Sequence, residues 1–241
     1  MGNKRVRFSD IIIHEDDSVL LVNKPEGMAS LDDKSEENLN FMAKQYNPDL
    51  QLAHRLDKLT SGILLMAKTP EVYRHLAMQF QNRAVRKEYL ALVNGVHHFD
   101  DFHVTLPLLV TTNKKVLISK SDGKRAETIF NVEKIYRHCT LLRCQPVTGR
   151  MHQIRVHLSA SNAPIVGDSL YGGADLMLSE IKRKYVPSGR KDEERPINHG
   201  FLLHAQRLAF SHPETEEEVT YEAPLSKNFA TSLKVLDKWD Q

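Results

Sequence analysis

An arginine and an aspartate lie between two apolar stretches at residues 51–68, QLAHRLDKLTSGILLMAK. If Leu52 and Leu56 face the core of an extended strand, the alternate residues face the other way. Arg55 and Asp57 then share that opposite face. A carboxylate beside a guanidinium at a strand end is suited to nucleophilic or electrostatic catalysis. A surface turn fixed by Asp57 is the alternative, and the local pattern leaves both interpretations open.

A second charged group lies at residues 148–160, TGRMHQIRVHLSA. On a helix, His152 and Arg155 share a face. An arginine is a natural partner for a carboxylate that must stay ionised. The spacing of His152 and His157 does not fit a helical zinc pair, and no acidic or thiol ligand is near, so no metal site is predicted. A solvated basic helix is the alternative.

Two further segments have a simple structural interpretation beside a functional one. Tyr89, in the expected strand KEYLALV, suits a core position, but its ring could also stack on a base in an RNA site. NKPEG, residues 23–27, is a turn at a strand end.

Apolar periodicity predicts the elements that position these groups. Helices are expected within 34–47, 70–85 and 149–162. Strands are expected within 10–27, 50–56, 62–68, 87–95, 104–111, 116–119, 126–136, 139–147, 201–213 and 216–225. Many strands without β-α-β alternation indicate an α+β fold with a mixed, mainly antiparallel central sheet, flanked by helices and loops. We expect one domain over 1–241, with a flexible charged insertion at 174–200.

Composition places the chain among globular proteins, with 241 residues and a net charge of +2. No apolar run approaches the roughly 18 residues of a membrane span, and the N-terminus does not fit a signal peptide. A cytoplasmic location and a monomer are therefore expected, without a membrane partner. Cys139 and Cys144 fall on opposite faces of one strand, which predicts reduced thiols. Basic clusters suit a phosphate backbone or simply a solvated surface; they are RAVRK (83–87), NKK (113–115), IKRKY (181–185) and SGRK (188–191).

Taken in order, these segments resemble the motif series of the RluA-type pseudouridine synthases. The matching segments are NKPEG, HRLDKLTSGILLMAK, KEYLALV, TGRMHQIRVHL, PIVGDSLYGG and LLHAQRLAFSHP. The resemblance runs from about residue 10 to residue 225. It implies the pseudouridine synthase fold and an isomerase that converts uridine in ribosomal or transfer RNA to pseudouridine. The implied reaction needs no cofactor and no metal.

The resemblance also implies roles for single residues. Asp57 is the essential catalytic carboxylate, Arg155 is its ion-pair partner, and Tyr89 stacks on the target base and assists removal of its C5 proton. Arg55 holds the flipped nucleotide by its phosphate, and Leu203 packs against the site. Arg150 and His152, from the same motif as Arg155, are further candidates for substrate binding.

Some features differ from the family pattern. Family members often have an N-terminal S4-like RNA-binding domain, and here the catalytic pattern begins near residue 10. The usual HP dipeptide does not follow the NKPEG turn, and Leu59 stands where an acidic residue is common. A non-catalytic RNA-binding protein with the same fold is the main alternative. A glycoside or nucleoside hydrolase is less suitable, because that chemistry usually uses two carboxylates and the motifs supply one.

Overall fold

The computed structural model describes residues 6–31, 38–113, 115–183, 185 and 194–240. The chain forms two compact units. The first contains Met1–Lys87 and Ala205–Leu225, and the second contains Glu88–His204 and Ser226–Gln241. Neighbouring strands within each unit pair antiparallel, so the predicted α+β class is confirmed. That the whole chain acts as one catalytic domain stays a prediction.

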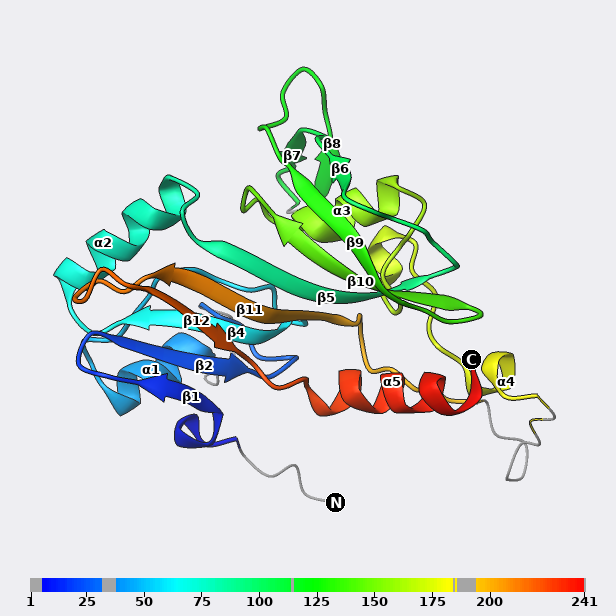
Figure 1. The fold of residues 1–241 in the computed structure, drawn as a ribbon, viewed down its shortest axis with the longest axis horizontal. Helices are drawn as coiled ribbons and strands as arrows, with labels where there is room; N and C mark the ends of the chain where they lie inside the picture. Colours follow the sequence, from blue (N-terminus) through cyan, green and yellow to red (C-terminus); the bar gives the residue numbers. More distant parts are fainter. Residues whose placement is uncertain (1–5, 32–37, 114, 184, 186–193, 241) are drawn as a thin grey trace. The chain divides into compact units, whose positions relative to one another are not determined.

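The first unit is built on apolar strands in the order β1-β2-β4-β11, with β12 beside β11 and β3 beside β4 (Figure 1). Its strands are β1 (Ile12–Glu15), β2 (Val19–Lys24), β3 (Gln51–Leu52), β4 (Ser61–Ala67), β11 (Leu203–Ser211) and β12 (Glu218–Glu222). Every residue of β4 is buried. A continuous apolar run of this kind is typical of a strand covered on both faces.

Three helices accompany this sheet, namely the 3-10 helix η1 (Phe8–Ile11), α1 (Leu39–Tyr46) and α2 (Pro70–Gln81). The hydroxyl of Thr69 accepts the N–H of Val72 at 3.3 Å, and Pro70 occupies the first turn of α2. Asn38 caps α1 in the same way through the N–H of Phe41. The expected helix therefore begins at Leu39, and residues 32–37 lie outside the described part of the chain.

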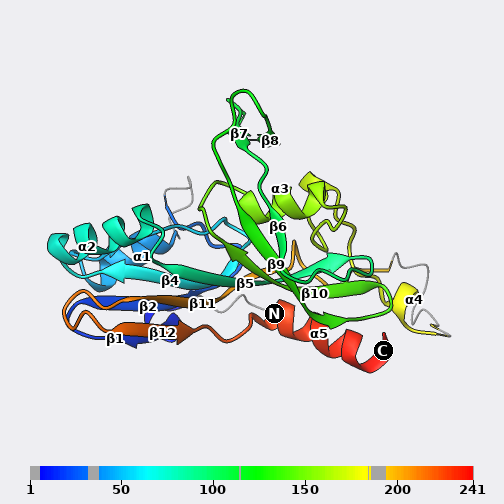
Figure 2. The ribbon, with the colours of Figure 1, turned by 45° about the horizontal axis from the view of Figure 1, so that its top comes forward.

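The second unit has strands in the order β5-β10-β9-β6 and a separate two-stranded hairpin, β7-β8. Figure 2 shows this hairpin projecting away from β5 and β10. The strands are β5 (Arg86–Asn94), β6 (Phe102–Val104), β7 (Leu108–Val110), β8 (Val116–Ile118), β9 (Thr128–Ile135) and β10 (Cys139–Pro146). The helices are α3 (Gln153–Ala160), η2 (Ser169–Tyr171), α4 (Leu178–Ile181) and α5 (Lys227–Trp239).

Cys139 and Cys144 are buried in β10 and are free thiols, as expected. Burial raises the pKa of Cys139 to about 12, an effect to which the charges of Asp240 and Glu180 add. Among the described residues, no helix combines the length and the apolar character that a membrane crossing requires.

The described ends of the expected insertion at 174–200 are attached to each other. The side chain of Asn198 accepts the N–H of Leu176 at 2.7 Å and donates to Asp175 at 2.9 Å. Leu176 and Ile181 are buried. Residues 184 and 186–193 lie outside the described part of the chain, and so do Lys114 of the NKK cluster, Lys184 of IKRKY and the whole of SGRK. The predicted flexibility of this segment stays a prediction.

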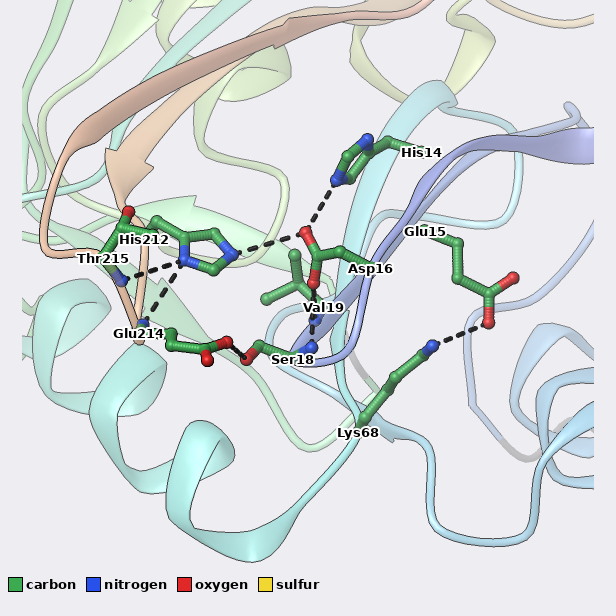
Figure 3. A network of polar contacts seen from close by, with 9 residues as sticks. All are labelled: His14, Glu15, Asp16, Ser18, Val19, Lys68, His212, Glu214 and Thr215. Carbon is green, nitrogen blue, oxygen red and sulfur yellow. Dashed lines mark hydrogen bonds and ion pairs between the residues drawn. The ribbon is translucent and has the colours of Figure 1, made fainter.

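Asp16 connects two turns of the first unit (Figure 3). Its Oδ1 accepts the N–H groups of Ser18 and Val19, each at 2.8 Å. Its Oδ2 lies 2.7 Å from Nε2 of His14 and 3.3 Å from Nε2 of His212, which follows β11. One carboxylate thus stabilises the β1-β2 turn and links it to the β11-β12 turn.

We expect Asp16→Ala to lower the free energy of unfolding by about 1–3 kcal/mol, because two buried N–H groups lose their acceptor. Partial burial acts to raise the pKa of Asp16, but bonds from Val19, His14 and Ser18 outweigh it and lower the pKa to about 2. A depressed carboxyl pKa stabilises the fold above the unfolded value of about 3.8, and this stabilisation is lost as pH falls to about 2. In urea titrations between these pH values, the free energy of unfolding of wild type should approach that of Asp16→Ala as the pH falls. Asp17→Ala removes a neighbouring exposed carboxylate and should change little; equal effects of both variants would contradict the assignment.

Candidate active site

Asp57 lies on an irregular turn of the first unit. β3 ends at Leu52, so the strand expected over 50–56 is wrong after its first residues. Arg55 is exposed, whereas Asp57 is half-buried and Leu56 is buried. The predicted strand alternation of Arg55 and Asp57 therefore does not apply, because the backbone leaves the pleated conformation before either residue.

The segment around NKPEG holds this turn in place. The hydroxyl of Ser30 donates to the carbonyl of Leu56 at 2.8 Å and accepts the N–H of Leu56 at 3.1 Å. The N–H of Gly27 donates to the carbonyl of Lys58 at 2.9 Å. Backbone groups on both sides of Asp57 are thus fixed by a segment about 30 residues earlier.

Lys24 also binds the turn that carries Asp57, and its side chain does so from a buried position. It is fully buried, and its Nζ donates to the carbonyls of Pro25 (3.1 Å), Met28 (2.8 Å) and Lys58 (3.2 Å). Burial lowers the pKa of Lys24 to about 7, while the negative charges of Asp57 and Glu26 oppose this shift. The buried amino group thus binds the backbone of the turn, and the negative charge of Asp57 favours its protonated form.

If Asp57 is catalytic, as the family resemblance implies, we expect Lys24→Met to lower kcat of the implied isomerisation about tenfold or more, because the turn that carries Asp57 loses the bond to the carbonyl of Lys58. The free energy of unfolding should also fall, since three backbone carbonyls lose a donor. Steady-state kinetics with urea denaturation separate the two effects. Lys44→Met is the matched control, because its Nζ also donates to a carbonyl, that of Pro48, at an exposed site. A normal kcat in Lys24→Met would show that Lys24 does not position Asp57.

His54 has a structural role at the start of the turn. Its Nε2 accepts the N–H of Leu65 at 3.1 Å, and its ring packs on Phe80 with centroids 5.0 Å apart. Burial, together with the positive charge of Lys87, lowers the pKa of His54 to about 3. The imidazole is therefore neutral near pH 7 and ties the turn to β4.

Gly62 is required because another strand passes very close to its backbone. It lies inside β4 with φ +112°, and a Cβ atom there would lie 2.2 Å from the carbonyl oxygen of Ala205. The glycine thus permits β11 to approach β4 directly after the Asp57 turn.

In the second unit, Gln153 organises the turn that precedes α3. Its Oε1 accepts from the hydroxyl of Thr148 (2.6 Å) and the N–H of Arg150 (3.0 Å), while its Nε2 donates to the carbonyl of Glu127 (2.8 Å). His152 has a left-handed backbone, φ 53°, immediately before the helix. The prediction that His152 shares a helical face with Arg155 is therefore wrong, because α3 begins one residue later.

Arg155 is buried among groups that recognise a guanidinium. Its Nε and one terminal nitrogen donate to the two oxygens of Asp168, at 2.7 and 2.8 Å. The rings of Tyr171 and Phe201 lie 4.8 and 4.3 Å from its Cζ. Such contacts hold a charged side chain in one orientation. Sequence reasoning did not predict Asp168 as a partner of Arg155, and the pairing of Arg155 with Asp57 stays a prediction.

The remaining candidates fall in two environments. Leu203 is buried in an apolar cluster with Ile154 and Phe201, against which Tyr89 packs. Arg150 is exposed, and its Nε donates to the carbonyl of Arg125 at 3.3 Å. The structure thus brings Tyr89 and Leu203 together in one cluster and leaves Arg150 at the surface.

Comparison with known proteins places this fold and these motifs in one family. A family described as RNA pseudouridylate synthase matches residues 18–160. The solved structure "Human RNA Pseudouridylate Synthase Domain Containing 1" is 27% identical, with a TM-score of 0.66, and the match covers 89% of this chain and 83% of that chain. "Human RNA Pseudouridylate Synthase Domain Containing 4" has the same fold, with a TM-score of 0.71 at 24% identity, over 95% of this chain and 94% of that chain.

The chain therefore belongs to the RNA pseudouridylate synthase family, as an RluA-type member and an isomerase. Its curated relatives include "Ribosomal large subunit pseudouridine synthase C" of Buchnera aphidicola subsp. Baizongia pistaciae, 38% identical over 95% of this chain and 71% of the relative. The protein of that name from Escherichia coli K12 is 37% identical over 97% of this chain and 72% of the relative. The predicted family, fold class and enzyme class are confirmed.

Proposed function

We propose that this protein converts a uridine of large-subunit ribosomal RNA to pseudouridine, with Asp57 as the essential carboxylate. The names of the relatives, which are ribosomal large subunit pseudouridine synthases, support the choice of ribosomal RNA over transfer RNA. The enzyme acts in the cytoplasm as a monomer.

The reaction breaks the bond between C1′ of the ribose and N1 of uracil and forms a bond from C1′ to C5. C5 loses its proton and N1 gains one, so the atoms balance without a further reactant. Positive charge develops on the sugar as the first bond breaks, and a nearby carboxylate stabilises it or attacks C1′. The target nucleotide must leave its helical stack, at a cost of a few kcal/mol.

The other candidate residues take roles that their side chains permit. Tyr89 stacks on the flipped base, and Arg155 supplies positive charge for the carboxylate. Arg55, which is exposed, binds the phosphate of the flipped nucleotide. Leu203 supplies an apolar wall.

Two weaker candidates, Arg150 and His152, contact RNA at the turn before α3. This turn is held by the buried side chain of Gln153.

The attachment of the Asp57 turn is the observation that carries the proposal. Ser30 and Lys24 bind backbone groups on either side of Asp57 and leave the carboxylate half-buried. Preorganised charge of this kind is what electrostatic catalysis requires.

The test is pseudouridine mapping on unmodified RNA. Purified protein is incubated separately with large-subunit ribosomal RNA, small-subunit ribosomal RNA and total transfer RNA. Carbodiimide adducts of pseudouridine are then located as stops of reverse transcriptase. A new stop confined to large-subunit RNA is expected, whereas a stop only in transfer RNA would overturn the choice of substrate.

Two further results would overturn the proposed reaction itself. Release of free uracil, measured by chromatography, would indicate a hydrolase. RNA binding without any stop, on naked RNA and on assembling ribosomal particles, would indicate an RNA-binding protein without chemistry.

A further inference from the structure

Trp239, in the last turn of α5, is the only tryptophan of the chain, and it is 38% exposed. Tryptophans are highly buried on average. The ammonium groups of Lys182 and Lys238 each lie 4.8 Å from the centre of its ring. Lys182 directly follows α4, which lies beside this end of α5 (Figures 1 and 2). Trp239, Lys182 and Lys238 together form the Trp239 surface, an exposed aromatic ring with two cations.

The last turn of α5 is held in place by contacts other than those of Trp239. The carboxylate of Asp240 is buried, accepts the N–H of His138 at 3.0 Å and contacts Nδ1 of the same residue. The carboxylate of Asp237 accepts the hydroxyl of Tyr136 at 2.8 Å. Both contacts attach α5 to the turn between β9 and β10. The indole therefore has a defined position, although much of it is exposed.

Positive charge predominates around the indole. One carboxylate of the last turn is buried against His138, and the other pairs with Lys134 at 2.6 Å. Glu180 of α4 adds one exposed negative charge, against the positive charges of Arg183 and of the two lysines of the Trp239 surface. An aromatic ring beside basic side chains is how proteins bind single-stranded nucleic acid, since bases stack on the ring and the cations bind phosphates.

We propose that the Trp239 surface binds a single-stranded segment of RNA: one base stacks on the indole, and Lys182 and Lys238 bind the adjacent phosphates. The base replaces an ammonium group over the ring, and that group moves to a phosphate. The choice of RNA as the ligand rests on the proposed function. The binding itself requires no isomerisation, so it can be measured with RNA that contains no uridine.

The first experiment titrates wild type with a short oligoadenylate. Because Trp239 is the only tryptophan, tryptophan emission reports on this surface alone. We expect saturable quenching, since a stacked base contacts the indole directly.

The contribution of the ring is measured with a labelled oligoadenylate, whose fluorescence anisotropy gives the dissociation constant for each variant. Trp239→Ala should weaken binding about tenfold or more. Trp239→Phe should weaken it less, because phenylalanine keeps an aromatic face. Circular dichroism checks that both variants fold. An unchanged dissociation constant in Trp239→Ala would overturn the proposal.

The lysines are tested through the salt dependence of binding. Lys182→Gln and Lys238→Gln should each lower the slope of log affinity against log salt by about 0.7, because each removes one phosphate contact to single-stranded RNA. Lys227→Gln is the matched control, since it removes an exposed lysine from the first residue of the same helix. That control should keep the wild-type slope. Equal changes in all three variants would indicate general attraction to RNA and overturn the site.

Two further results would also overturn the proposal. Binding by anisotropy without quenching of Trp239 would show that the oligoadenylate binds elsewhere. A tryptophan spectrum that changes with protein concentration in the absence of RNA would indicate that a second copy of the chain covers the ring.

The outcomes separate this surface from the proposed function. A wild-type enzyme that forms pseudouridine but shows no quenching would refute the Trp239 surface alone. A wild-type protein that binds oligoadenylate through Trp239 but forms no pseudouridine would refute the proposed function alone.

Discussion

Asp57→Asn is expected to lower kcat for pseudouridine formation by ~10³-fold or more, while RNA affinity changes little. Asparagine has nearly the same shape as aspartate but cannot stabilise positive charge on the ribose or attack C1′. The turn should survive, because the backbone N–H of Thr60 donates to the backbone carbonyl of Asp57 at 3.1 Å, a bond that the substitution leaves in place. Single-turnover assays with saturating protein measure the chemical step, and filter binding measures affinity.

The matched control is Asp49→Asn, which removes an exposed carboxylate from the same unit and should keep wild-type activity. A loss of RNA binding in Asp57→Asn equal to the loss in rate would indicate a binding role for Asp57. Unchanged kcat would exclude Asp57 as the essential carboxylate.

Asp168→Asn is expected to lower the free energy of unfolding by about 3–5 kcal/mol. The Asp168 side chain is 1% exposed and that of Arg155 is 7% exposed, so the variant leaves a buried guanidinium without its carboxylate. A domain is stable by only about 5–15 kcal/mol, so a large share of stability is lost. Urea denaturation followed by circular dichroism measures the change.

Asp237→Asn provides the comparison. Asp237 pairs with Lys134 at 2.6 Å, but both side chains are 46% exposed, and such surface pairs contribute about 0–1 kcal/mol. Equal destabilisation by the two variants would contradict the importance of burial at Asp168. In the folded fraction of Asp168→Asn, we also expect reduced activity, because Arg155 loses the partner that orients it.

Local sequence patterns predicted the helices and strands that short-range features of the sequence determine, such as apolar periodicity and helix capping. The apolar runs of β2 and β4 and the capped, proline-initiated α2 lie where periodicity places them. The strand expected over 50–56 was wrong after Leu52. Its alternating apolar residues fit a strand, but contacts from Lys24 and Ser30 determine the backbone conformation around Asp57. Such contacts, about 30 residues apart in sequence, leave no periodic signal.

The sequence predicted which residues are candidates for the site, but not which residues they bind. His152 and Arg155 share a motif, yet a left-handed backbone at His152 separates it from the helix, and no periodicity reveals that conformation. Asp168 lies in a glycine-containing loop, so its bond to Arg155 depends on how that loop folds back on α3. α5 was missed although Ser226 caps it and Phe229, Ser232 and Leu236 are buried at helical spacing.

The unit that contains Asp57 is formed from two distant parts of the chain, and this affects its synthesis. β4 must wait for β11 to be translated, because residues 88–204 come between the two segments. At about 5–20 residues per second, that delay is on the order of ten seconds. Throughout it the nascent chain carries a largely apolar strand with one edge paired only by the two residues of β3, the kind of segment that chaperones bind and that aggregates when they do not. The position of Asp57 beside β4 therefore makes the translation of residues 88–204 the period in which the unit that holds Asp57 is most exposed to misfolding.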